Sequence, residues 1–171
     1  MKKNIKYLIV ALVLLVGLAL VACASIDSIF FEKQPRTLYV QGQDLDFTDT
    51  VLVAVSGDKN TPVDMSSGEV TVSGYDKNVV GEQVVTFTYK ETSTTLKITV
   101  IPRIAVEGAS NKYFIGDVFD KTKGRLKVAD DMGNITTVNM ADEGVTIVDF
   151  DSSKAASGKL VTVKYGEYTG T

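Results

Sequence analysis

An internal repeat constrains this chain more than any other feature, because a segment that occurs twice predicts one fold built twice. Residues 39–46 (YVQGQDLD) correspond to residues 113–120 (YFIGDVFD), and VSGYD (72–76) corresponds to IVDFD (147–151). Further along, Gly81 leads to Tyr89 as Gly158 leads to Tyr165, with one residue fewer in the second copy. The offset between the copies stays between 74 and 77 residues. The sequence therefore predicts a tandem duplication of a domain of about 70 residues.

Within each copy, apolar and polar residues alternate along short segments that are separated by turn-forming residues. Alternation that restarts about every 8–12 residues is typical of β-sandwiches and barrels. GDKNTP (57–62) and DDMGN (130–134) are predicted hairpin loops. No segment after the leader keeps a helical apolar period, so we predict an all-β fold. The alternating segments are 70–73, 84–89 and 95–100 in the first copy, and 125–128 and 160–165 in the second. Residues 51–55 (VLVAV) are apolar throughout, so we expect a strand that is buried on both faces or nearly so.

These signatures resemble the bacterial immunoglobulin-like (Ig-like) domains of the group 3 type. The first copy follows the family pattern from Tyr39 to Val100, most closely over VSGYDKNVVGEQVVTFTY (72–89), and the second follows it from Tyr113 to Tyr165. The resemblance implies two tandem Ig-like β-sandwiches, at residues 36–101 and 102–171. It also implies extracellular modules that act as spacers or adhesive units and share no catalytic residues.

The first 22 residues have the pattern of a secretory signal peptide, which we expect to be helical. A short basic stretch, MKKNIK, precedes an apolar run of 15 residues from Tyr7 to Val21, and small Ala22 follows. These three parts are the elements of a signal sequence. A permanent spanning helix needs about 20 apolar residues, more than this run supplies.

The junction Leu20-Val21-Ala22-Cys23 resembles the lipobox of bacterial lipoproteins. The resemblance implies signal cleavage after Ala22 and lipidation of Cys23 by diacylglycerol and palmitate-like chains. Residues 23–35 would then be a lipid-anchored tether, and the protein would lie on the extracytoplasmic face of the cell membrane, held there by lipid. Plain secretory cleavage and an uncleaved signal anchor remain alternatives. A redox role is not favoured, because the chain has no second cysteine.

Composition excludes several classes of function. The chain has no histidine, which removes most zinc chemistry and every Ser-His or Cys-His nucleophile. Three of its 18 basic residues precede Cys23, so the remainder carries 15 basic and 21 acidic residues, a formal charge of −6. With no Lys/Arg cluster in that remainder, nucleic acid is not an expected partner. We expect no enzyme activity, no cofactor and no metal site.

Three groups of acidic residues could suggest sites, and each has a simpler structural explanation. The group Asp130, Asp131 and Asn134 lacks the ligand spacing of a calcium loop and suits a tight turn. The group Asp44, Asp46 and Asp49 is expected to be a solvated surface. The pair Asp149 and Asp151 would need a cleft between separated carboxyl groups to hydrolyse a glycoside, and Asp151 matches the turn residue Asp76 in the first copy.

The second copy differs from the first at its end. The first closes with TTLKITVI (94–101), whereas the second stops at GEYTGT (166–171), so we expect the second sandwich to lack its last strand. A sheet edge left in this way exposes backbone donors and acceptors. Either the chain continues beyond Thr171, which we expect, or a partner strand completes the sheet.

The sequence thus predicts a non-enzymatic cell-surface lipoprotein whose repeats serve as spacer or adhesion modules. The membrane is one expected partner, through Cys23, and a cell-wall, glycan or protein ligand is another candidate. The alternative is the N-terminal stalk of a larger surface enzyme or polysaccharide-binding protein. An in-frame catalytic domain in the DNA beyond the codon for Thr171 would support that alternative.

Overall fold

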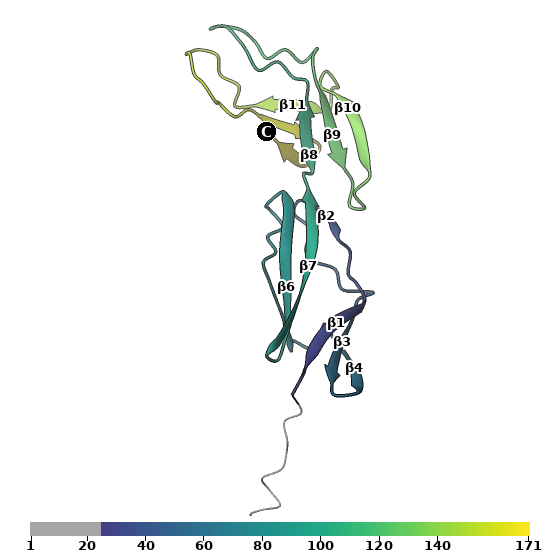
Figure 1. Ribbon diagram of the computed structural model, residues 1–171. Coiled ribbons are helices and arrows are strands. Elements are labelled where there is room, and N and C mark those ends of the chain that lie inside the picture. Colours follow the sequence, from purple (N-terminus) through teal and green to yellow (C-terminus); the bar gives the residue numbers. More distant parts are fainter. Residues whose placement is uncertain (1–24) are drawn as a thin grey trace, which may run out of the picture.

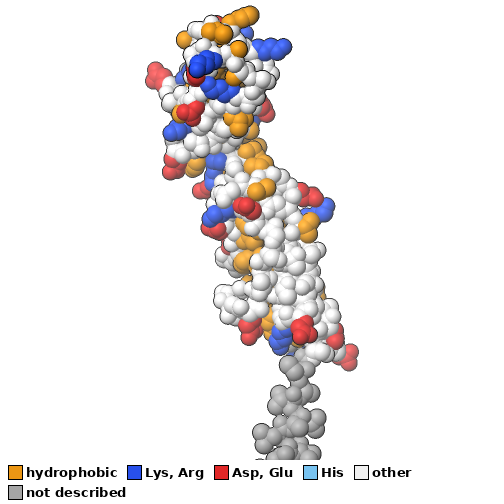
Figure 2. All heavy atoms as spheres, turned by 90° about the vertical axis from the view of Figure 1, so that its left-hand side faces the viewer, with side chains coloured by type: hydrophobic (Ala, Val, Ile, Leu, Met, Phe, Trp, Pro, Cys, Tyr) orange, Lys and Arg blue, Asp and Glu red, His pale blue; other side chains and the backbone are white. Residues whose placement is uncertain are grey.

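The computed structural model describes residues 25–171, and this part of the chain consists of thirteen β-strands joined by turns and loops, with no helix. Figure 1 shows two bodies stacked end to end along one long axis, and Figure 2 shows the same elongated outline. The predicted all-β fold of two tandem β-sandwiches is confirmed. The predicted signal helix, the cleavage position Ala22 and the lipidation position Cys23 lie outside the described residues. No helix between residues 25 and 171 is long and apolar enough to cross a membrane.

The first domain, residues 25–101, contains seven strands in two sheets. One sheet has the strand order β1-β3-β4, and the other has the order β2-β7-β6-β5. Neighbouring strands are antiparallel, except that β2 runs parallel to β7. The strands are β1 (Ser28–Lys33), β2 (Leu38–Val40), β3 (Val51–Ser56), β4 (Lys59–Val63), β5 (Val70–Ser73), β6 (Gly81–Tyr89) and β7 (Thr92–Ile101).

The second domain, residues 104–171, repeats this plan with six strands. Its sheets have the orders β8-β9-β10 and β11-β12-β13. Residues 112–114, which correspond to β2 in the repeat, form no strand. The strands are β8 (Ile104–Glu107), β9 (Arg125–Ala129), β10 (Ile135–Asn139), β11 (Val145–Val148), β12 (Thr162–Tyr165) and β13 (Tyr168–Gly170).

The alternation of apolar and polar residues decides which face of each strand is buried. Val85 and Phe87 of β6 are fully buried, whereas Val84, which directly precedes Val85, is 55% exposed. Successive side chains of a strand point to opposite faces, so one face of β6 closes on the opposite sheet and the other meets water. Two apolar clusters in the first domain and one in the second form the interior. Their fully or nearly buried members are Tyr39, Val85, Phe87, Ile98 and Val100; Ile29, Leu52 and Ala54; and Ile104, Leu126, Val138, Met140, Val145 and Val163.

The first strand corrects the predicted tether. Residues 28–33 belong to the 23–35 segment that the sequence assigns to a tether, yet they form β1 and pair with β3. Ile29 is 5% exposed and packs with Leu52 and Ala54. The apolar residues of SIFFEK therefore contribute to the core, and the first domain begins earlier than residue 36.

Two further differences concern turns. The 57–62 segment is not a six-residue loop, because β3 and β4 are joined by Gly57 and Asp58 alone and β4 already begins at Lys59. The predicted loop at 130–134 does join two strands as expected. After Tyr165, where no strand was expected, the chain turns at Gly166 (φ 59°) and forms β13, in which Tyr168 pairs with Tyr165. The first domain makes the same turn at Lys90 (φ 53°).

The repeated tyrosine–glycine motif folds into the same turn in both domains. Gly42 and Gly116 have φ values of 94° and 91°, in the left-handed region that favours glycine. The next residue, Gln43 or Asp117, accepts a hydrogen bond through its side chain from the backbone N–H three residues earlier, at 2.8 and 2.7 Å. The duplication seen in the sequence is therefore a duplication of hydrogen-bonding geometry.

Only Pro102 and Arg103 separate the last strand of the first domain from the first strand of the second. The Arg103 side chain is 13% exposed, and its Nη1 donates to Asp131 Oδ1 at 2.7 Å and to the Ala129 carbonyl at 3.3 Å. Its guanidinium lies 4.8 Å from the ring centroid of Tyr168, a cation–π contact. Arg103 thus ties the connecting segment to two hairpins of the second domain.

The 130–134 turn also contacts the first domain directly. Gln43 Nε2 donates to the Asp131 carbonyl at 2.9 Å. A Cβ at Gly133 would lie 3.2 Å from Leu38 Cδ2, so the two surfaces approach closely there. Asp130 stiffens the turn, because its carboxylate accepts hydrogen bonds from the Asn134 backbone and side chain, both at 2.9 Å. The two domains therefore meet through a short linker and a structured turn.

Arg103→Ala is expected to loosen this junction without unfolding either domain. The change removes an ion pair with an exposed partner and a cation–π contact, together worth about 1 kcal/mol. Residual dipolar couplings measured by NMR should then fit one common alignment tensor less well than in the parent protein. Arg125→Ala, at an exposed position of β9, is the control and should leave the couplings unchanged. Unaltered couplings in Arg103→Ala would show that Arg103 does not fix the relative orientation.

Candidate functional site: a groove in the second domain

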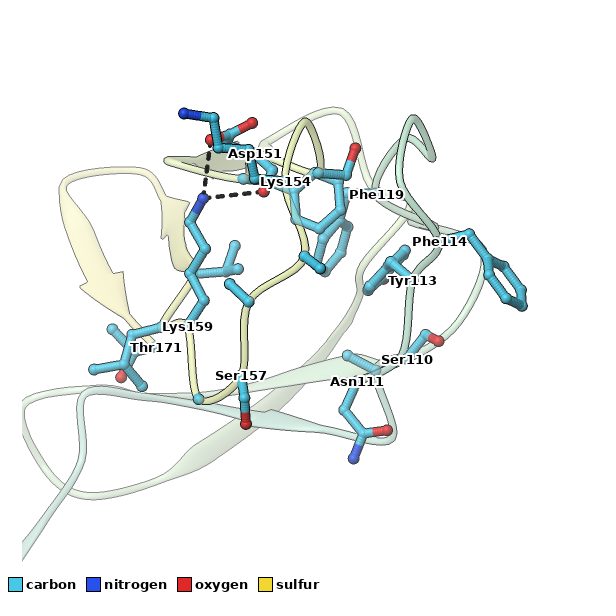
Figure 3. A pocket seen from close by; sticks show the side chains of 18 of the residues that line it. Ser110, Asn111, Tyr113, Phe114, Phe119, Asp151, Lys154, Ser157, Lys159 and Thr171 are labelled. Carbon is cyan, nitrogen blue, oxygen red and sulfur yellow. Dashed lines mark hydrogen bonds and ion pairs between the residues drawn. The ribbon is translucent and has the colours of Figure 1, made fainter.

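An open groove of about 800 Å³ lies on the second domain (Figure 3). One wall comes from the 109–115 segment and the other from the 150–161 segment. Val106, Phe119 and Val163 contribute apolar surface to its lining. Figure 3 places Thr171 at the side of the groove opposite Phe114. A cavity of this size, mostly apolar and with a few polar groups, is typical of binding sites.

In the first domain a strand fills the corresponding place. There β7 lies between β6 and β2, antiparallel to the former and parallel to the latter. By the repeat, residues 158–165 correspond to β6, residues 112–114 correspond to β2, and β13 corresponds to β7. Strand β13 has three residues, whereas β7 has ten. The groove therefore occupies the place that Leu96–Ile101 fill in the first domain.

One repeat position explains why the wall near residues 157–161 is a loop. Gly74 has a φ of 84°, and a Cβ there would lie 2.5 Å from the Val84 carbonyl oxygen, so only glycine lets β6 pass this turn so closely. The second copy has Asp149 at this position, with a φ of 62°. Its side chain rules out the same close approach. Accordingly Leu160, the counterpart of Val84, lies outside β12 and is 75% exposed.

Three aromatic rings support the 109–115 wall. Tyr113 stacks on Phe119 with a centroid distance of 5.6 Å and meets the edge of Phe150 at 4.8 Å. The hydroxyl of its counterpart Tyr39 accepts a hydrogen bond from the Asp46 N–H at 3.2 Å. The Tyr113 hydroxyl is buried and has no hydrogen-bond partner within residues 25–171.

The rim of the groove carries an ion pair between Asp151 and Lys159. Lys159 Nζ lies 3.3 Å from Asp151 Oδ2 and donates to the Asp151 carbonyl at 3.0 Å, as drawn in Figure 3. Asp151 also accepts a hydrogen bond from the Ser153 N–H at 2.9 Å. The hydrogen bonds from Ser153, followed by the interaction with Lys159, lower the pKa of Asp151 from its ordinary 3.8 to about 2. Asp151 is therefore ionised at pH 7.

Ser153→Ala is expected to raise the pKa of Asp151 toward its ordinary value, because the largest of these stabilising hydrogen bonds is lost. Since the pKa of Asp151 is lower in the folded state, its ionised form stabilises the fold above about pH 4, and this contribution disappears as the pH falls toward 2. NMR titration of the side-chain carboxyl carbon would measure both midpoints. Ser157→Ala is the control and should leave the pKa unchanged. A midpoint near 2 in Ser153→Ala would contradict the assignment.

The other acidic groups singled out in the sequence are parts of turns or surface ion pairs. Asp130 forms the turn described above, and Asp131 pairs with Arg103. Asp44 lies 2.8 Å from Lys77 Nζ, and Asp49 lies 3.4 Å from Lys33 Nζ. Asp46 accepts two hydrogen bonds from Thr48, which lower the pKa of its carboxyl group. Among residues 25–171, no three acidic or sulfur ligands lie close enough together to hold a metal ion.

Sequence reasoning did not identify the groove as a site. The structure brings together the second tyrosine–glycine motif, Asp151 and the end of the chain, which the sequence suggests only as separate features. The available signal was the combination of two departures from the first copy: Asp149 in place of Gly74, and one residue fewer between Gly158 and Tyr165. The segment after Gly158 forms part of one wall of the groove, and Asp149 directly precedes the lining residues Phe150 and Asp151.

Comparison with known proteins gives a family for one part of the chain. No curated protein matches the sequence. Among solved structures, the solution structure of a protein described as a "putative surface protein" shares 24% sequence identity with this chain; the match covers 52% of this chain and 97% of the other, with a TM-score of 0.31. Residues 33–100, which make up most of the first domain, match the family of bacterial Ig-like domains (group 3), and this part of the protein is such a domain.

Proposed function

We propose that this protein is a lipid-anchored, non-enzymatic module of the bacterial surface, in which the two β-sandwiches act as a spacer that carries a binding surface. The observation that supports this most is the end-to-end stacking of the domains (Figure 1) through the two-residue linker. The contacts of Arg103 and of the 130–134 turn limit how freely the domains can move. A stiff connection of this kind suits a spacer better than a flexible tether.

The direction of the chain also supports the proposal. The described part begins at Ser25, where the Ser25 carbonyl accepts a hydrogen bond from Ser56 Oγ at 2.8 Å and Asp27 Oδ2 accepts one from the Gly57 N–H at 2.6 Å. This end of the first domain is remote from the second domain in Figure 1. A lipid on Cys23 would therefore hold the first domain near the membrane and present the groove of the second domain farther out.

The absence of enzymatic activity is part of the proposal. The chain contains no histidine, and its acidic residues with shifted pKa values are turn formers whose pKa values are lowered, as at Asp46, Asp120 and Asp151. A general acid at pH 7 needs the opposite shift, toward a higher pKa. These features favour binding or mechanical work over catalysis.

Cys23→Ser is expected to abolish incorporation of a clickable fatty acid in the producing bacterium, because serine lacks the thiol that receives the diacylglycerol. Gel fluorescence after the click reaction measures the incorporation. Ser25→Ala, two residues further on, is the matched control and should label normally. Persistent labelling of Cys23→Ser would overturn the lipid anchor.

Accessibility on intact cells tests the surface location separately. A membrane-impermeant amine reagent should modify lysines of the second domain, such as Lys154, without cell lysis. Modification that requires lysis would place the domains inside the cell or beneath an outer layer and would contradict the proposed location.

A further inference from the structure

We propose that strand β10 is a self-association edge, at which it pairs antiparallel with β10 of a second copy of this chain about a two-fold axis at Thr137. The two β8-β9-β10 sheets would then join into one continuous sheet. The pairing itself does not depend on the lipid anchor. Its consequence for adhesion rests on the proposed function, because it requires that each molecule is held to a membrane at its N-terminal end.

Strand β10 is the outer strand of its sheet. Within residues 25–171 its only strand partner is β9, and Figure 1 shows it at the outer side of the second domain. The corresponding strand of the first domain, β4, is likewise the outer strand of the β1-β3-β4 sheet. An open edge at this position therefore belongs to the plan of both domains.

The backbone geometry shows which residues of β10 face this edge. The Ala129 N–H of β9 donates to the Arg103 carbonyl at 3.0 Å, on the side of β9 away from β10. Backbone groups alternate in direction along a strand, so those of Lys127 also point away from β10. Lys127 lies opposite Thr137 in the ladder. The N–H and C=O of Thr137 therefore point away from β9, toward the open edge.

The two domains differ in how this edge is protected. The registers align Val63 of β4 with Val138 of β10, since each lies opposite a fully buried leucine of its hairpin. Pro62 of β4 therefore corresponds to Thr137. Proline has no N–H to offer a further strand, and β4 also carries Lys59; both residue types are common protection of sheet edges. Strand β10, with the sequence ITTVN, has neither a proline nor a charge.

Apolar side chains are exposed at the same edge. Ile135 of β10 is 59% exposed, and Met132, in the turn before it, is 80% exposed. Strand β5 is also an uncharged outer strand, but its apolar residues Val70 and Val72 are half-buried. Exposed apolar surface is characteristic of interaction sites. Strand β10 thus combines an unprotected edge with apolar side chains in contact with water.

A second copy of β10 complements this edge. In an antiparallel pair centred on Thr137, its N–H and C=O exchange both hydrogen bonds with the same groups of the copy. The two Thr137 side chains then lie opposite each other, a pairing worth about 0.2–1 kcal/mol. On either side, Thr136 would meet Val138, and Ile135 would meet Asn139. No pair brings like charges together, and two-fold interfaces are the commonest in homo-oligomers.

Antiparallel pairing also determines how the two molecules are oriented. Strand β10 runs with the long axis of the molecule in Figure 1, so the two-fold axis reverses the long axis of the second copy. The N-terminal ends then point in opposite directions, as for molecules anchored in two facing membranes. Because a five-residue edge buries little area, one contact should be weak, with a Kd of about 0.1–1 mM. Many anchored copies would gain avidity, which suits contact between cells.

Clustering of vesicles tests the pairing. The full chain is purified in detergent and reconstituted through its apolar leader into phosphatidylcholine vesicles, whose size is followed by dynamic light scattering. Vesicles that carry the parent protein should cluster, with a mean diameter that rises at least about threefold. Thr137→Lys and Thr137→Glu should each abolish clustering, because like charges meet at the two-fold axis. Mixing the two populations of vesicles should restore it, because opposite charges then meet.

Further variants separate backbone pairing from other effects. Thr137→Pro copies Pro62 and removes the N–H that faces the edge, so it should abolish clustering, whereas Thr137→Val keeps the N–H and should still cluster. The circular-dichroism spectrum of Thr137→Pro should match that of the parent, because the lost N–H has no partner in the β9-β10 ladder. Thr61→Lys, at an exposed position of β4, is the matched control and should cluster normally.

Three results would overturn the proposal. The parent vesicles could fail to cluster, which would exclude self-association through this edge. Vesicles with Thr137→Lys alone or Thr137→Glu alone could cluster as well as the parent, which would place the contact elsewhere. The mixed populations could stay dispersed, which would exclude pairing between facing membranes. None of these results bears on the lipid anchor, which the labelling of Cys23→Ser tests by itself.

Discussion

Phe87→Ala is expected to destabilise the first domain strongly and to leave the stability of the second domain unchanged. The Phe87 ring is 0% exposed and lies between the two sheets, with its centroid 4.9 Å from that of Phe31 and 6.0 Å from that of Phe47. Removing a buried phenylalanine side chain costs about 3–5 kcal/mol. A domain of this size has a total stability near the low end of about 5–15 kcal/mol. Most of the stability of the first domain would therefore be lost.

Differential scanning calorimetry can follow the two domains, because the Phe87→Ala transition should move by far more than that of the second domain. Val84→Ala is the matched control, since Val84 lies in the same strand but faces water and is 55% exposed. Its effect should stay within about 0.5 kcal/mol. If both domains of Phe87→Ala unfolded in one transition, they would be a single cooperative unit and not two independent sandwiches.

Gly74→Ala is expected to destabilise the first domain by about 3–4 kcal/mol. Two costs combine at this position. The φ of 84° is unfavourable for alanine by about 1–2 kcal/mol, and the new Cβ would lie 2.5 Å from the Val84 carbonyl oxygen, which is backbone and cannot move aside without disturbing β6. Urea denaturation followed by circular dichroism would give the free energy of unfolding.

Gly42→Ala separates the two costs. Gly42 has a similar φ of 94°, but nothing lies within 4 Å of an added Cβ. It should therefore show only the conformational cost of about 1–2 kcal/mol. In the second domain, Asp149→Gly should be neutral or stabilising by up to about 1 kcal/mol. Equal losses for Gly42→Ala and Gly74→Ala would show that the contact with Val84 is not what requires glycine.

The alternation of apolar and polar residues predicted most of the fold correctly. The inward faces of β5, β6 and β7 follow from the positions of Val70, Val85 and Ile98, because strand geometry leaves no other arrangement that buries them. The run Leu52-Val53-Ala54 was expected to be buried on both faces, and all three residues are buried. Because the second copy repeats this pattern, the sequence also predicted strands with one buried face in the second domain.

The errors occur where local sequence carries little information about tertiary pairing. Residues 28–33 have no turn-forming residues that separate them from the lipobox, which closely precedes them. The sequence therefore predicted that they belong to the tether. Lys59–Pro62 are turn-forming residues by composition, yet pairing with β3 holds them in a strand. The three residues of β13 have no apolar alternation of their own, and only the turn at Gly166 and its match to Lys90 indicate them.

The candidate site could be predicted only in part. The sequence indicated that the second copy has one residue fewer between Gly158 and Tyr165, and this segment borders the groove. It could not indicate that Tyr113, Phe119 and Phe150 would form one aromatic cluster, because their contacts depend on how three loops fold together. The turn roles of Asp130 and Asp151 were expected from their residue types and positions, and the structure confirms them.

The arrangement of β7 has a mechanical consequence. A pull on the second domain reaches the first through Pro102 and Arg103 and acts along β7, which runs with the long axis of the molecule in Figure 1. Strand β7 pairs with β6 over nine residue pairs and with β2 over three. Ladder hydrogen bonds lie across the strands, so a force in this direction must shear all of them together and cannot open them one by one. The first domain should therefore resist unfolding by tension applied along the long axis of the molecule.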